Sequence, residues 1–149
     1  MPFQFRLKVL LQHREYLHRR AQMALATAQR QLKDVEHQIT KVKEEVRQQT
    51  LLWHERQSAG IQVTHYLAFT EYLQSLEQQL LKLNTEREWA AGEVEKARQA
   101  LIEKEKEVKI LESLKEQGRE EYHHLELRNE QKQLDEAAIF RDYYKKSSP

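Results

Sequence analysis

The stretch SAGIQVTHYLAFTEYL, Ser58 to Leu73, interrupts a sequence that otherwise favours continuous helix. Gly60 suits the position just after a helix end, where a left-handed backbone conformation costs little without a Cβ. The β-branched residues Ile61 and Val63 add little helix propensity. Thr64 suits the N-cap of a second helix, although the residues after it do not complete a capping box. A short turn here makes the flanking helices antiparallel neighbours.

Before this stretch, apolar residues recur at alternating steps of three and four. Eleven of fourteen such positions are apolar, and a 3.5-residue repeat places them as one stripe along a coiled-coil helix. Two polar exceptions, Arg14 and His18, can extend to solvent. The positions are Leu7, Leu11, Arg14, His18, Ala21, Leu25, Ala28, Leu32, Val35, Ile39, Val42, Val46, Gln49 and Trp53.

A second stripe with the same spacing follows the turn. It comprises Tyr66, Phe69, Leu73, Leu76, Leu80, Leu83, Arg87, Ala90, Val94, Ala97, Leu101, Lys104, Val108 and Leu111. Beyond Leu111 the next stripe positions are Lys115 and Gly118, so we expect the register to fail there.

Together the stripes predict an all-α fold, an antiparallel two-helix coiled-coil hairpin forming one domain over residues 1–149. With the turn at its centre, Trp53 faces the level of Phe69 and Leu7 faces Leu114. The second stripe therefore ends where the first helix runs out of chain. A parallel dimer gives no reason for this coincidence.

We expect the first helix over about residues 4–57, the turn over about 58–63 and the second helix over about 64–144, followed by a short disordered tail. At 1.5 Å per residue the helices run roughly 80 Å and 120 Å. The longer helix therefore overhangs the hairpin by several turns. The overhang is either a frayed end or, as we favour, a face that a partner covers. Its apolar residues are Leu125, Leu127, Leu134, Ile139, Phe140, Tyr143 and Tyr144.

Composition excludes several classes of protein. One third of the residues are charged and 39% are apolar, which is typical of long helices rather than of a thick core. The absence of cysteine excludes disulfides and thiolate metal sites. No apolar run approaches the roughly 18 residues of a membrane span, and the start lacks the apolar region of a secretory signal. These features indicate a soluble, intracellular protein.

Basic residues are concentrated near the start. Residues 1–30 contain six basic residues and one acid, Glu15, a net charge of +5. A solvated helix end accounts for this simply, while the alternatives are contact with an acidic partner, an anionic membrane face or nucleic acid. An organelle transit peptide is also Arg-rich, but here the apolar positions stay in register with the following helix. Nucleic acid is not expected as a partner, because the basic residues do not continue as a stripe beyond Arg20.

The sequence offers no catalytic or cofactor site. Three scattered glycines cannot form a phosphate-binding loop. His123 and His124 are adjacent and point about 100° apart on a helix, and a solvated ion pair explains Glu120 and His124 more simply than a metal does. No nucleophile, base and orienting group can be assembled in a concave pocket. We therefore predict no enzyme activity, no cofactor and no metal.

Two motifs resemble the flagellar FliJ family. One is SAGI at 58–61 followed by HYLAFTEYLQSLEQQL at 65–80; the other is LRNEQKQLDE at 127–136, which is similar to the family's C-terminal signature. Chain size and turn position agree along essentially the whole chain. The resemblance implies an antiparallel coiled coil similar to the stalk of the rotary ATPase γ subunit, within the flagellar type III export apparatus.

The resemblance also implies partners and a location. The partners are a hexameric flagellar export ATPase, a membrane export-gate protein and empty flagellar export chaperones. The protein would promote assembly of the ATPase ring and couple it to the gate. It would lie in the cytoplasm, peripherally associated with the cytoplasmic face of the inner membrane.

Positions matching the family's gate-binding face hold Gln38, Tyr72 and Leu76. The chain departs from the family at Glu45 and Gln49, where aromatic residues are expected on the facing helix.

For the ATPase, the candidate is the open end of the hairpin, because a narrow charged tip can enter the central hole of a ring. It joins the basic start to the overhanging signature. The residues are Arg14, Arg19, Arg20, Arg128, Gln131, Lys132, Asp135 and Glu136.

Two other readings remain open from the sequence. One is a coiled-coil scaffold or spacer in a different assembly, which would not stimulate an export ATPase. The other is a basic nucleic-acid-associated coiled coil, whose salt-sensitive binding would be lost on neutralising Arg14, Arg19 and Arg20.

Overall fold

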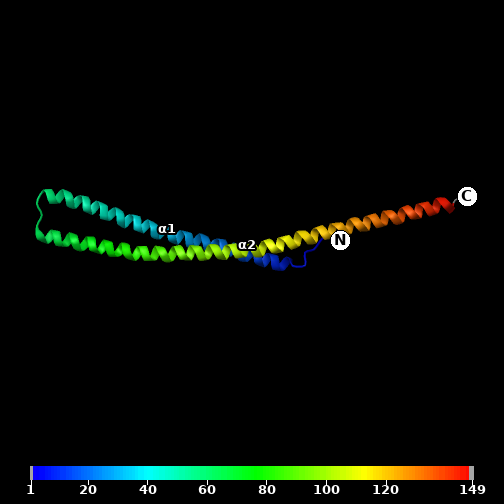
Figure 1. The fold of residues 1–149 in the computed structure, drawn as a ribbon, viewed down its shortest axis with the longest axis horizontal. Helices are drawn as coiled ribbons and strands as arrows, with labels where there is room; N and C mark the ends of the chain where they lie inside the picture. Colours follow the sequence, from blue (N-terminus) through cyan, green and yellow to red (C-terminus); the bar gives the residue numbers. More distant parts are fainter. Residues whose placement is uncertain (1, 148–149) are drawn as a thin grey trace. The chain divides into compact units, whose positions relative to one another are not determined.

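The computed structural model describes residues 2–147, which form two long helices and no strand. Helix α1 spans Lys8–Ser58 and helix α2 spans Val63–Ser147. Both helices extend from the turn towards the same side, with opposite chain directions (Figure 1). The predicted all-α helical hairpin is confirmed.

The chain divides into two compact units. One unit combines Met1–His18 with Lys104–Pro149, and the other comprises Arg19–Glu103. Both helices contribute to both units. The expectation of a single domain stays a prediction.

The turn lies in the Arg19–Glu103 unit, and its conformation is the one that its residues predict. Helix α1 ends at Ser58, and the amide of Ala59 donates to the carbonyl of Arg56 at 3.1 Å. Gly60 has φ 87°, a conformation that costs a residue with a Cβ roughly 1–2 kcal/mol. This confirms that the glycine permits the turn.

Helix α2 begins one residue earlier than expected, at Val63. The amide of Tyr66 donates to the carbonyl of Gln62 at 3.1 Å. The residue whose carbonyl accepts the first helical bond is the N-cap. Gln62 therefore holds that position, and the assignment of Thr64 as N-cap is wrong.

The seam of the Arg19–Glu103 unit uses the predicted stripes. Its most buried side chains are Ala28, Ile39, Leu76, Leu83, Ala90 and Val94. Tyr66 and Arg87 are the stripe positions that remain exposed in this unit, and a long cation can extend from a seam edge to water. The two stripes pack against each other in the predicted register, as the stacking of Trp53 on Phe69 shows.

The other unit has a small core where both helices meet. Leu11 packs with Val108 and Leu111, and Phe5 covers this cluster. Phe5 lies outside the helix, because α1 begins at Lys8 rather than near residue 4. The amide of Lys8 donates to the carbonyl of Phe5 at 3.1 Å.

The N-terminal strap, residues 2–7, is non-helical for a reason that its sequence contains. Phe3 and Phe5 are two residues apart, so a helix would point them about 200° apart. An extended chain points alternate residues to the same side, and both phenyl rings are half-buried. The Phe3 ring lies 5.8 Å from the ring of Tyr122.

The seam does not stop at Leu111, and the expected register failure is wrong. Lys115, Gly118 and Tyr122 continue the steps of three and four and are half-buried. A Cβ built on Gly118 would lie 3.3 Å from Cζ of Phe3. Gly118 therefore gives the Phe3 ring its place on α2.

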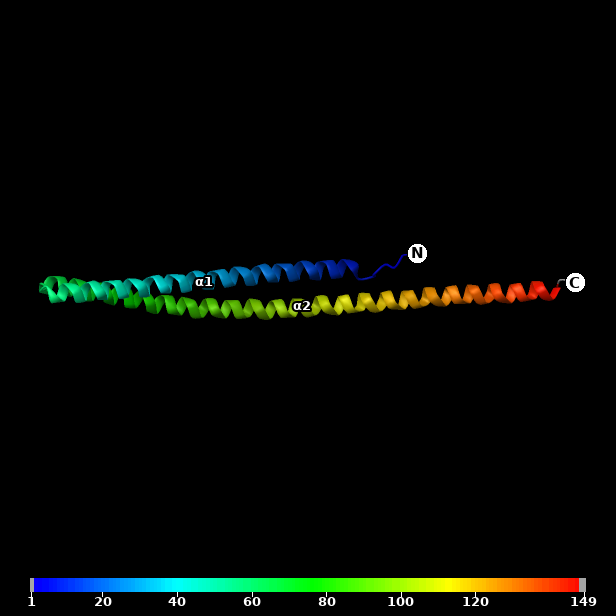
Figure 2. The same cartoon turned by 90° about the horizontal axis from the view of Figure 1, so that it is seen from above.

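Beyond Tyr122, α2 continues as a lone helix, as the overhang predicted. Every described side chain from His123 to Lys146 is exposed, and Figure 2 shows this part of α2 continuing past the N-terminal segment. Lys145 to Ser147 belong to α2, and the rest of the expected disordered tail, residues 148–149, lies outside the described residues. No helix among residues 2–147 combines the length and the apolar character needed to cross a bilayer.

Candidate functional site

An aromatic cluster supports the turn end of the hairpin. The rings of Trp53 and Phe69 stack with centroids 4.4 Å apart and planes 5° from parallel, and Tyr66 lies 5.6 Å from Trp53. Beside the cluster is an open cavity of about 500 Å³. It is lined by Gln49, Leu52, Trp53, Arg56, Ala59, Gly60, Ile61, His65, Ala68, Phe69 and Tyr72. The turn end thus offers an apolar hollow with polar groups around it.

The three expected gate-binding residues differ in accessibility. Leu76 is only 6% exposed and packs within the seam, while Tyr72 is 42% exposed and lines the cavity. Gln38 is exposed on α1, two helical turns or about 10 Å before Glu45, which contacts Tyr72. Of the three residues, Gln38 and Tyr72 are therefore accessible to a partner, whereas Leu76 is not.

The two residues that depart from the family pattern form a polar link between the helices. The Tyr72 hydroxyl donates to Oε1 of Glu45 at 2.9 Å, and Nε2 of Gln49 donates to the same oxygen at 3.1 Å. The hydrogen bond to Glu45 raises the pKa of Tyr72 above its usual value of 10.0, because it favours the neutral phenol. The expected aromatic contact is here replaced by hydrogen bonding.

The basic residues near the start are not a single free surface. Nη1 of Arg14 pairs with Glu107 at 2.9 Å, and Lys104 approaches the same carboxylate at 3.6 Å. His18 Nε2 is buried without a hydrogen-bond partner and lies 3.6 Å from the carboxylate of Glu105. Arg14 therefore joins α1 to α2 and is engaged within the hairpin.

Arg19 and Arg20 are exposed. Both belong to the Arg19–Glu103 unit, whereas Arg14 and the C-terminal signature belong to the other unit.

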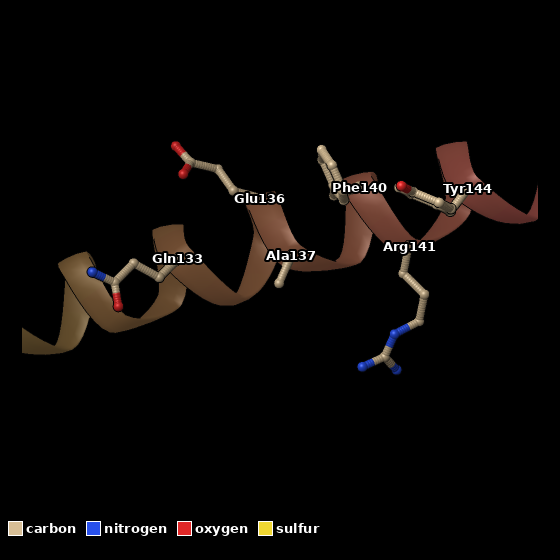
Figure 3. A pocket seen from close by; sticks show the side chains of 6 residues that line it. All are labelled: Gln133, Glu136, Ala137, Phe140, Arg141 and Tyr144. Carbon is tan, nitrogen blue, oxygen red and sulfur yellow. The ribbon is translucent and has the colours of Figure 1, made fainter.

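The C-terminal signature lies on the lone part of α2, and all five of its expected binding residues are exposed. Arg128, Gln131, Lys132 and Asp135 recur at three, four and seven residues and share one helical face. Nε2 of Gln131 donates to Oδ1 of Asp135 at 3.2 Å on this face. Glu136 points elsewhere, beside Ala137 and Phe140 (Figure 3).

The structure does not bring Arg14 to the signature. Arg14 contacts Glu107, which precedes Arg128 by 21 residues, or about 30 Å along the helix. The assignment of these residues to one ATPase-binding end stays a prediction.

Among residues 2–147 no group of three or more His, Asp and Glu side chains could hold a metal ion. His123 and His124 have ring centroids 6.5 Å apart. The expectations of no metal, no cofactor and no enzyme activity stay predictions.

Comparison with known proteins settles the family. A model described as "Flagellar FliJ protein" matches residues 3–147. The chain belongs to the FliJ family. A search of curated proteins finds no match. Membership of this family makes the chain a component of a type III export apparatus.

A solved structure shows the same fold. This FliJ-family chain is similar to a YscO homolog, CT670, of Chlamydia trachomatis, with 22% identity and a TM-score of 0.61. The similarity covers 99% of this chain and 100% of that one.

Two features escaped the sequence interpretation. One is the strap, whose Phe3 ring lies against Gly118. The signal for it in the sequence was the alternation of Phe3 and Phe5 just after Pro2. The other is the cavity at the turn. Its lining residues come from both helices and from the turn itself, so no local pattern marks it.

Proposed function

We propose that this FliJ-family chain acts as a stalk of the flagellar export apparatus, promoting assembly of the hexameric export ATPase and coupling it to the membrane export gate. It also escorts empty export chaperones. It works in the cytoplasm, peripherally associated with the inner membrane, and catalyses nothing itself. Family membership and the hairpin fold support this proposal.

The observation that carries the ATPase contact is the exposure of the signature on a lone helix. Arg128, Lys132 and Asp135 lie on one face of α2 and have no α1 beside them. A helical face with fixed charges at known spacing is suited to docking in a larger, complementary surface.

The gate contact is proposed for the part of the hairpin nearer the turn, at Gln38 and Tyr72. The hydrogen bond from Tyr72 to Glu45 fixes the ring at the mouth of the cavity. Aromatic side chains held beside an apolar hollow are common anchors in protein interfaces.

The test measures ring formation and ATP turnover of the purified cognate ATPase with and without the chain. We expect wild type to increase both, and Arg128→Glu with Lys132→Glu to abolish most of the increase. Arg119→Glu is the matched control, because it reverses a charge on the same helix nine residues earlier, where Arg119 approaches Glu116.

No stimulation by wild type would remove the stalk function and leave a scaffold or spacer. Equal stimulation by the double variant would show that the signature face is not the ATPase contact.

A further inference from the structure

One face of the lone part of α2 carries an apolar stripe. Its members recur at helical spacing and are all exposed. Figure 3 shows the C-terminal part of this stripe, where the rings of Phe140 and Tyr144 lie 5.4 Å apart. The stripe consists of Leu127, Leu134, Ala137, Phe140 and Tyr144. The signature residues Arg128 and Asp135 lie on the opposite side of the helix.

Opposite charges lie at the two ends of this stripe. Glu130 and Arg141 are eleven residues apart, which brings both to the same side of the helix within about 20°. Elsewhere the helices pair such charges locally: Arg47, Arg98 and Arg119 each contact a glutamate three residues earlier.

Glu130 and Arg141 have no such local partner. Three and four residues before Arg141 are alanines, and the residues three and four after Glu130 are Gln133 and Leu134. Across residues 2–147 neither side chain makes an ion pair or a hydrogen bond. An exposed apolar stripe with unpaired, opposite charges at its ends is complementary to its own reversed copy.

We propose that the stripe pairs with the same stripe of a second copy of this chain, with the two helices antiparallel. Each Glu130 then faces Arg141 of the second copy, so the two-fold arrangement forms two ion pairs. Leu127 faces Tyr144 and Leu134 faces Ala137, which places a large side chain against a smaller one at the centre. Such an interface is isologous and closes as a dimer.

The expected dimer is weak and concentration-dependent. The overlap covers roughly twenty residues, or about 30 Å of each helix, and one stripe of this length buries less than the roughly 1,200–2,000 Å² of stable complexes. Exposed ion pairs contribute little to affinity but select orientation, because like charges are placed together in the wrong alignment. The pairing requires no ATPase, so it goes beyond the proposed function and is tested independently of it.

The experiment compares sedimentation of the full chain and its charge-reversed variants, up to about 1 mM protein because weak pairing lies in that range. We expect wild type to approach the mass of two chains, whereas Glu130→Arg and Arg141→Glu alone each weaken dimerisation at least about tenfold, a difference of about 1.4 kcal/mol. An equimolar mixture of the two variants dimerises, since each contact then joins opposite charges.

The single variants separate the two orientations, because in a parallel pair each only exchanges one like-charge contact for another and leaves dimerisation unchanged. The double variant E130R/R141E restores opposite charges, and with them dimerisation, in the antiparallel arrangement. Arg119→Glu is the control outside the stripe, and circular dichroism checks that each variant keeps its helix content. A wild-type chain that stays monomeric overturns the proposal, as do single variants that dimerise like wild type or a double variant that stays monomeric.

Discussion

Gly118 has no side chain and therefore leaves room for the Phe3 ring to lie against α2. The other helical glycine, Gly92, has no atom within 4 Å of where a Cβ would stand. Both interrupt α2 equally in terms of helix propensity. The two positions therefore separate a packing effect from a backbone effect within one helix.

Substituting alanine at each glycine should give different results. We expect Gly92→Ala to raise the free energy of unfolding by about 0.5–1 kcal/mol, from helix propensity alone. Gly118→Ala should gain less, because its Cβ would stand 3.3 Å from the Phe3 ring. In a Phe3→Ala background the two gains should become equal. Urea unfolding of the two single glycine variants, of Phe3→Ala and of the two double variants measures this. Equal gains in the wild-type background would show that Gly118 is not needed to make room for the Phe3 ring.

Tyr72 gives a prediction for alkaline pH. Its folded pKa is raised above 10.0 chiefly by the hydrogen bond to Glu45, so the folded state favours the neutral phenol. The resulting stability is fully present below about pH 10, the unfolded value, and is lost as pH rises through the higher folded pKa. Glu45→Ala should lower the pKa of Tyr72 towards 10.0. Nuclear magnetic resonance of labelled tyrosine rings measures it, and an unchanged titration would show that Glu45 is not the cause.

At the scale of elements, the turn is held by aromatic stacking as well as by its own hydrogen bonds. Only a few backbone bonds close the turn, and that of Gly60 to Gln57 is 3.4 Å long. The stacked pair Trp53 and Phe69 adds about 0.5–1.5 kcal/mol beyond the area it buries. The stacked pair thus joins α1 to α2 at the end of the hairpin, together with the Trp53–Tyr66 ring contact and the hydrogen bond from Tyr72 to Glu45.

The two tryptophans make this testable. Trp53→Ala should destabilise the fold by about 2–3 kcal/mol, somewhat below the cost of truncating a fully buried aromatic residue. Trp89→Ala is the matched control: Trp89 is 65% exposed, so its loss should cost less than about 0.5 kcal/mol. Denaturant unfolding followed by circular dichroism compares them. Similar losses for both variants would show that stacking does not hold the turn.

At the scale of the whole molecule, α2 has paired and lone parts. Leu76, Leu83, Ala90 and Val108 are buried against α1, whereas residues from His123 onward are exposed. Local opening is cheapest where few apolar contacts must break. One continuous helix therefore combines segments of different local stability.

Hydrogen exchange should reveal this difference. We expect amides at 127–146 to exchange at least about tenfold faster than those at 73–111, because a lone helix lacks tertiary packing. Mass spectrometry of peptides from α2 measures the rates, and peptides from 73–111 are the internal reference. Uniform protection along α2 would mean that something else covers its lone part.

The sequence predicted the stripes because a repeat of three and four is a local property. The same repeat placed Leu76 in the seam, where the structure buries it, although the family resemblance assigned it to a partner. The strap was missed because the first helix was extended to residue 4, which ignored the geometry of Phe3 and Phe5. The repeat alone marks Gly118 as a break, since only the position of the Phe3 ring shows why a small residue is needed there.

The absence of any interruption in α2 between Tyr122 and Asp135 fixes the direction in which the signature faces. Inserting one residue after Tyr122 turns every later side chain by about 100°, while inserting seven restores the direction to within about 20° and shifts it roughly 10 Å outward. A docking partner that depends on azimuth will tolerate the long insertion better than the short one. The number of residues between Tyr122 and the signature thus sets the direction in which the signature side chains point.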